Sequence, residues 1–96
     1  MDLKETREKI AEIDREMAGL FCRRMKAAEE IASYKREHGL PVRDPQQEER
    51  VKERNLAFLE DGTLSEYYLA FLDRVIALSR AYQETILEEK RGGEEA

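Results

Sequence analysis

The stretch LKETREKIAEIDREMAGLFCRRMKAAEEIASYKREH, residues 3–38, contains no proline, and its apolar residues recur every three or four positions. That spacing is typical of an α-helix with one apolar face. Asp2 precedes the stretch and Glu5 follows three residues later, which is the capping-box pattern of a helix N-terminus. Gly39 and Pro41 follow the stretch, and this pair is typical of a helix end. The sequence therefore predicts one long helix over residues 3–38.

The length of this helix predicts more than one chain in the folded unit. Its 36 residues, at 1.5 Å each, extend for about 54 Å, whereas a compact monomer of this size is about 32 Å across. The apolar stripe nevertheless continues along nearly the whole helix, through Leu3, Ile10, Ile13, Met17, Leu20, Ala27, Ile31 and Tyr34. Two shorter helices of the same chain do not cover so long a stripe. We expect an intertwined helical homodimer, with a solvated coiled-coil arm as the alternative.

The rest of the chain predicts two further helices. Asp44 is a suitable N-cap and Pro45 a suitable first residue for a helix over about Pro45–Glu60. Thr63 and Glu66 form another capping box, which predicts a third helix ending near Glu89. The alternation of β-branched and aromatic residues that predicts strands is absent from the sequence. The expected fold class is all-α, with one long N-terminal helix and two shorter helices per chain.

Length and composition limit the class of protein. The 96 residues predict a single domain over 1–90, followed by a flexible charged tail over 91–96. A net charge of −5 argues against nucleic acid as the main partner, and one cysteine, Cys22, excludes an internal disulfide. Neither a membrane-spanning apolar run nor a signal peptide is visible in the sequence. We therefore expect a cytoplasmic protein without a membrane partner.

Cationic residues interrupt the apolar stripe of the long helix. Arg24 occupies the same heptad position as Ile10 and Ile31, and Arg7 and Lys35 flank that position. A buried charge is costly unless another group compensates it. Several cations directed at one core therefore favour a small anionic ligand, although ion pairs within the protein and extended side chains that reach solvent are the alternative.

The other two helices contribute polar residues to the same core. Ser79 lies on the apolar stripe of the third helix, with Gln83 one turn later, and Glu48 follows Asp44 by one turn. Arg24 and Lys35 are eleven residues apart, about 16 Å along one helix, so both side chains can reach a ligand between them.

Arg7 lies too far along the helix to reach that ligand. It is seventeen residues from Arg24, about 25 Å along a straight helix. If Arg7 serves a binding site, it must serve the site of a partner chain. An antiparallel dimer with two shared sites would provide this arrangement.

Four stretches in this order resemble the all-α chorismate mutases, which are small intertwined homodimers with three helices per chain. They are TREKIAEID at 6–14, RRMKAAEEIASYK at 23–35, PVRDPQQEE at 41–49, and the pair Ser79 and Gln83. The resemblance covers about residues 3–88. It implies the rearrangement of chorismate to prephenate on the route to phenylalanine and tyrosine.

The resemblance also implies roles for individual residues. Arg7 of one chain and Arg24 of the other would bind the two substrate carboxylates, and Ser79 would assist. Lys35 and Gln83 would flank the ether oxygen of the C–O bond that breaks. We expect these contacts to come from both chains of the dimer.

The first turns of the second helix complete the implied site. Asp44 and Glu48 would lie near the ring hydroxyl, with Glu48 accepting its hydrogen bond. Gln47 stands where many family members have an arginine that contributes positive charge. The implied catalytic residues are Arg24, Lys35, Glu48 and Gln83.

The implied reaction is a unimolecular [3,3] rearrangement, for which we expect no cofactor and no metal. The protein has to fold a flexible dicarboxylate and stabilise charge on the ether oxygen. Two alternatives remain: an isochorismate-pyruvate lyase, which shares the fold and a similar pocket, and a non-catalytic helical dimerisation or ligand-sensing domain.

Overall fold

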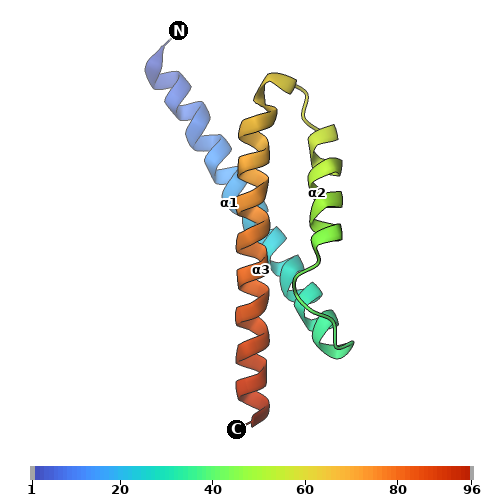
Figure 1. Cartoon of the computed structure of the whole chain (residues 1–96). Coiled ribbons are helices and arrows are strands. Elements are labelled where there is room, and N and C mark those ends of the chain that lie inside the picture. Colours follow the sequence, from blue (N-terminus) through green and yellow to red (C-terminus); the bar gives the residue numbers. More distant parts are fainter. Residues whose placement is uncertain (1, 96) are drawn as a thin grey trace.

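The computed structural model describes the backbone of residues 2–95 and the side chains through residue 89. It contains three α-helices and one short 3₁₀ turn, in the order α1 (Leu3–Glu37), α2 (Pro45–Ala57), η1 (Gly62–Leu64) and α3 (Ser65–Glu95). No strand occurs among the described residues. The predicted all-α fold with three helices is confirmed (Figure 1).

Local side-chain caps begin the first two helices, as the sequence predicted. The Asp2 carboxylate accepts a hydrogen bond from the Lys4 backbone N–H at 2.9 Å, and the Asp44 carboxylate accepts one from the Gln47 N–H at 3.2 Å. These bonds satisfy N–H groups that have no partner within the helix. Gly39, with a φ of +65°, allows the chain to turn sharply after α1.

The turn between α2 and α3 differs from the expectation in two ways. The second helix ends at Ala57 and not at Glu60. The capping box at Thr63 is absent, because Asp61 caps the turn in its place and accepts bonds from both the N–H and the hydroxyl of Thr63. The cap therefore precedes a 3₁₀ turn, and the α-helix begins at Ser65.

The third helix is longer than expected. It continues to Glu95, beyond the expected end near Glu89. Residues 91–95 of the predicted charged tail therefore belong to α3, and the flexibility of that tail stays a prediction.

The third helix is the centre of the fold and packs against both other helices. Figure 1 shows α1 crossing α3 and its N-terminal half diverging from it, while α2 lies beside α3. The buried apolar side chains are few and lie around these contacts: Ala28, Ala32, Val42, Leu72, Ile76 and Leu87. The resulting chain is elongated, with extents of 59 × 28 × 15 Å.

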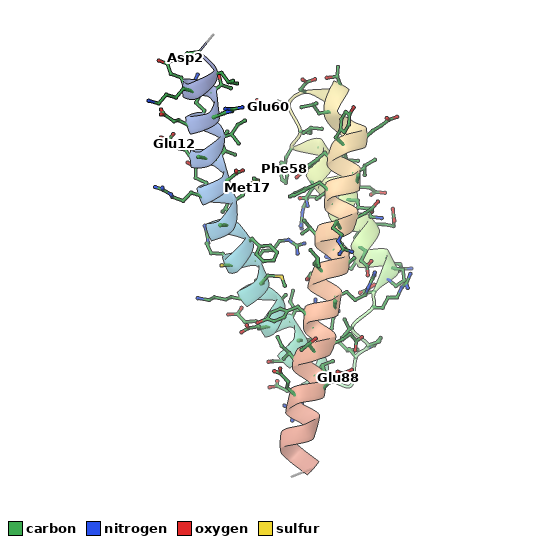
Figure 2. All side chains as sticks on the ribbon, turned by 90° about the vertical axis from the view of Figure 1, so that its left-hand side faces the viewer. Asp2, Glu12, Met17, Phe58, Glu60 and Glu88 are labelled. Atoms are coloured by element: carbon green, nitrogen blue, oxygen red, sulfur yellow. The ribbon has the colours of Figure 1, made fainter. Side chains whose placement is uncertain are left out.

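The first two-thirds of α1 project from this small core. The radius of gyration is 17.1 Å, compared with about 12 Å for a compact chain of this length. Along this part of the helix, the large apolar side chains are exposed: Leu3, Ile10, Ile13, Met17, Leu20 and Phe21. Figure 2 shows Met17 on α1 and Phe58 beyond α2, each in a part of the chain away from the buried core. The predicted projection of one helix end is confirmed, and the apolar stripe is uncovered in a single chain.

Two features are absent from the described residues. None of their helices has both the length and the apolar character needed to cross a bilayer. They also include no cluster of histidine, cysteine, aspartate and glutamate side chains suited to a metal ion.

Candidate active site

A cavity of about 190 Å³ lies where α1, α2 and α3 come together. It includes every site residue predicted from the sequence except Arg7. Its lining residues are Arg24, Ile31, Lys35, Val42, Asp44, Gln47, Glu48, Val51, Ile76, Ser79, Arg80 and Gln83. Packing of α1 and α2 on the same central helix therefore brings together residues that are far apart in the sequence.

Lys35 reaches the cavity from the last turn of α1. Its ammonium group donates a hydrogen bond to the Val42 carbonyl oxygen at 2.6 Å, and the side chain is half-buried. The bond ties the segment between α1 and α2 to the end of α1. An ammonium group carries three protons, so Lys35 can still donate to a ligand while it holds Val42.

Ser79 and Gln83 are the two buried polar side chains in the described part of the chain. The Gln83 amide nitrogen donates to the Ser79 hydroxyl at 3.3 Å, and the Gln83 amide oxygen has no hydrogen-bond partner among the described residues. Buried polar atoms are nearly always paired, so this unpaired oxygen needs a physical explanation.

Turning the Gln83 amide over would change this unpaired atom from an acceptor into a donor. If the amide turns over, its oxygen accepts a bond from the Ser79 hydroxyl, and its nitrogen takes the place of the unpaired oxygen as a donor. Gln83 lines the cavity and would then have a neutral N–H donor without a partner among the described residues. In this orientation Gln83 of α3 and Lys35 of α1 would each supply one hydrogen-bond donor.

Glu48 forms an ion pair with Arg80, a residue that the sequence analysis missed. The Arg80 Nη1 atom lies 2.7 and 2.9 Å from the two carboxylate oxygens of Glu48, and both side chains are partly buried. The signal in the sequence was its position beside Ser79 and three residues before Gln83, on the helix face next to the stripe. Its pairing with Glu48 depends on how α2 packs against α3, which no local pattern reveals.

The start of α2 has local structural roles as well as a place in the cavity. Asp44 caps the helix, and the Gln47 side-chain oxygen accepts a hydrogen bond from Arg50 Nε at 3.0 Å. The cavity as a whole has three cationic side chains, Arg24, Lys35 and Arg80, and two carboxylates. A helix N-terminus adds partial positive charge, so the balance favours an anion.

The two predicted site arginines, Arg24 and Arg7, lie at different places relative to the cavity. Arg24 lines the cavity from the middle of α1, although its side chain is exposed in the single chain. Arg7 is exposed on the projecting part of α1, outside the cavity. The role of each arginine stays a prediction.

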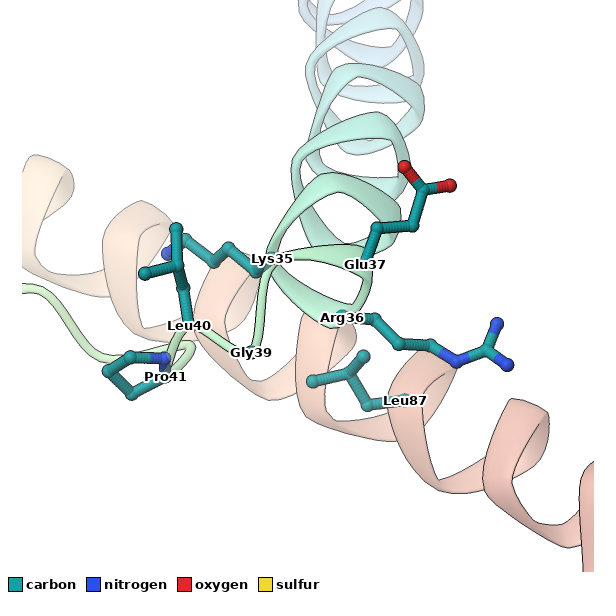
Figure 3. Close-up of a pocket in the computed structure, with 7 residues that line it drawn as sticks. All are labelled: Lys35, Arg36, Glu37, Gly39, Leu40, Pro41 and Leu87. Atoms are coloured by element: carbon teal, nitrogen blue, oxygen red, sulfur yellow. The ribbon is translucent and has the colours of Figure 1, made fainter.

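A larger hollow of about 690 Å³ lies at the turn between α1 and α2. Figure 3 shows that the side chains of Lys35 and Arg36, on its wall, point in opposite directions. These two cationic side chains therefore do not converge on one point in the larger hollow. The smaller cavity is the better candidate for a site that orients a ligand.

Comparisons with known proteins identify the family of the chain. The chorismate mutase of Methanocaldococcus jannaschii is 30% identical over 88 residues, which cover 91% of this chain and 89% of that protein. The T-protein of Haemophilus influenzae is 37% identical over 46 residues, which cover 48% of this chain and 12% of that protein. No solved structure matches the chain. Residues 6–84 match the family described as chorismate mutase type II, and the chain belongs to that family.

Proposed function

We propose that the protein is a chorismate mutase that converts chorismate to prephenate by a [3,3] rearrangement. The observation that carries the proposal is the shared cavity of Lys35, Glu48 and Gln83, in a chain of the chorismate mutase type II family. The reaction is unimolecular, so the proposal requires no cofactor. We infer a cytoplasmic location, where the exposed thiol of Cys22 stays reduced.

The chemistry of the reaction fits the donors in the cavity. The substrate is a flexible dicarboxylate that must be held in a reactive chair conformation, which is catalysis by orientation. As the C–O bond breaks, negative charge grows on the ether oxygen. Lys35 and the turned amide of Gln83 would donate to that oxygen, and preorganised donors of this kind stabilise a transition state more than a ground state.

The remaining polar residues of the cavity would hold the substrate. Arg24 and Ser79 would bind a carboxylate, since guanidinium groups bind carboxylates through charged hydrogen bonds. Glu48 would accept a hydrogen bond from the ring hydroxyl, with Asp44 nearby. Gln47 lies on the same wall.

The second carboxylate would be bound by Arg7 of a partner chain in a homodimer. The exposed apolar stripe of α1 supports this proposal, because so many uncovered large apolar side chains are unusual for a monomer. A second set of exposed apolar residues, Tyr67, Phe71 and Leu78, lies at helical spacing on α3. The cavity of one chain is also smaller than the 300–1,000 Å³ that is usual for a small-molecule site. A partner helix would add the missing wall.

The direct test is to follow the loss of chorismate with purified protein and to identify prephenate as the product. Isochorismate is then supplied separately, and release of pyruvate is measured. Conversion of chorismate, with little or no pyruvate from isochorismate, is the expected result. Pyruvate release as the main activity would identify a lyase, and the absence of turnover with both substrates would favour a non-catalytic ligand-binding domain.

A further inference from the structure

Arg80 is the cationic residue of the cavity to which the proposed reaction has so far given no role. Only one of its guanidinium nitrogens, Nη1, contacts Glu48. The Nη2 and Nε atoms have no hydrogen-bond partner among the described residues. A guanidinium group carries five N–H donors, so Arg80, which lines the cavity, has donors beyond those that Nη1 uses on Glu48.

The charge of Glu48 explains why a cation is needed at this place. An unpaired carboxylate in the wall would repel a substrate that carries two negative charges. Arg80 neutralises Glu48 through Nη1, and a carboxylate with about four lone-pair sites can still accept a hydroxyl hydrogen bond. The pair therefore allows Glu48 to remain a hydrogen-bond acceptor in a site for a dianion.

We propose that Arg80 also binds the substrate directly, by donating from Nη2 or Nε to one of its carboxylates while Nη1 stays on Glu48. Arg80 is the one cation that α3 contributes to the described cavity lining. Arg24 approaches from α1, so the two guanidinium groups of one chain belong to different elements. This inference rests on the proposed function, because it assigns a ligand within the same site.

A purely structural role for Arg80 is the competing explanation. The Arg80–Glu48 pair joins α3 to α2, and on this explanation its loss loosens that packing. A second ion pair provides a matched control: Lys52 of α2 lies 2.8 Å from Asp73 of α3, and neither residue lines the cavity. Lys52→Met thus removes a connection between the same two helices without touching the site.

The experiment compares wild type, Arg80→Met, Arg80→Lys and Lys52→Met by the KM and kcat for chorismate. Thermal unfolding measured by circular dichroism shows that each variant is folded. Loss of a hydrogen bond to a charged group predicts that Arg80→Met raises KM by about tenfold or more. The KM of Lys52→Met should stay within about twofold of wild type, since surface ion pairs contribute little.

Arg80→Lys separates direct binding from neutralisation of Glu48. The lysine keeps a cation beside Glu48 but lacks the planar set of spare donors, so KM should still rise by about threefold or more. This variant also retains the helix connection if Arg80→Met does not fold.

Three results would overturn the assignment. They are an Arg80→Met variant with the KM of wild type, an Arg80→Lys variant with the KM of wild type, and a Lys52→Met variant whose KM rises as much as that of Arg80→Met. A wild-type protein without turnover of chorismate would instead refute the proposed function, and the role of Arg80 with it.

Discussion

Gln83 lies one helical turn after Ser79 on α3, and its amide nitrogen donates to the Ser79 hydroxyl at 3.3 Å. Both side chains are buried, yet the Gln83 oxygen has no partner among the described residues. A serine can donate or accept, so it allows the glutamine amide to turn and present its N–H group to a ligand. Ser79 would therefore hold the Gln83 amide in the orientation in which its N–H group donates to the ether oxygen of the substrate.

Replacing Gln83 by glutamate should make catalysis dependent on acidic pH. A neutral amide donates at every pH, whereas a carboxyl group donates only when it is protonated. We expect kcat of Gln83→Glu at neutral pH to fall by about 10²-fold and to recover partly in acid. Wild type should show no such loss above about pH 6. The measurement is kcat against pH for both proteins, and a wild-type rate that collapses through loss of one proton would contradict the role of Gln83.

Lys35→Ala should reduce kcat by about 10²-fold or more, because it removes a donor that matters most in the transition state. The variant also removes the bond to the Val42 carbonyl oxygen, so thermal unfolding has to be measured beside the steady-state rate. Lys52→Ala, which changes a lysine outside the cavity, is the control. An unchanged kcat in folded Lys35→Ala would remove Lys35 from the mechanism.

Arg7→Ala and Arg24→Ala should each be nearly inactive alone and regain activity when mixed. If each site takes Arg7 from one chain and Arg24 from the other, a mixed dimer contains one intact site. Subunit exchange is monitored by native mass spectrometry, and activity is measured on the exchanged sample. Complete exchange without recovered activity would show that the sites are not shared.

Gln47→Arg should lower the KM for chorismate. Gln47 lines the cavity, so the arginine would add a cation there. A hydrogen bond between a charged group and a carboxylate corresponds to about a tenfold change in affinity or more. The KM is measured by initial rates, with Gln46→Arg as a control because Gln46 is not part of the cavity lining. Equal effects of the two substitutions would indicate general attraction of the substrate and not a local contact.

Asp61→Ala should destabilise the fold at neutral pH and much less in acid. The Thr63 hydroxyl and N–H donate to Asp61 and hold the pKa of its carboxyl group below the ordinary value of 3.8. This stabilisation is present above the pKa of the unfolded chain and is lost as the pH falls through the lower pKa of the folded chain. We expect a lower Tm for Asp61→Ala near neutral pH, with a smaller difference below about pH 3. Glu60→Ala is the control, and a Tm difference that does not depend on pH would contradict this explanation.

The sequence by itself determined the three helices and most of the cavity residues. Caps such as Asp2 and Asp44 act on N–H groups two or three residues away, so their effect is visible in a local pattern. Helical periodicity likewise places Arg24 and Lys35 on nearly the same face, and Ser79 and Gln83 on successive turns. The uninterrupted helical pattern also gave the length of α1. Because that length exceeds the diameter of a compact chain of this size, the sequence predicted that α1 extends beyond its own core.

Only the tertiary structure decided the contacts between distant segments. The sequence predicted a capping box at Thr63, whereas in the structure Asp61 caps the turn before α3 and accepts bonds from Thr63. The pairing of Arg80 with Glu48 joins residues thirty-two positions apart, and it exists because α2 and α3 pack side by side. Such a contact depends on the angle and offset of two helices, which the packing of many side chains sets together and no single motif encodes.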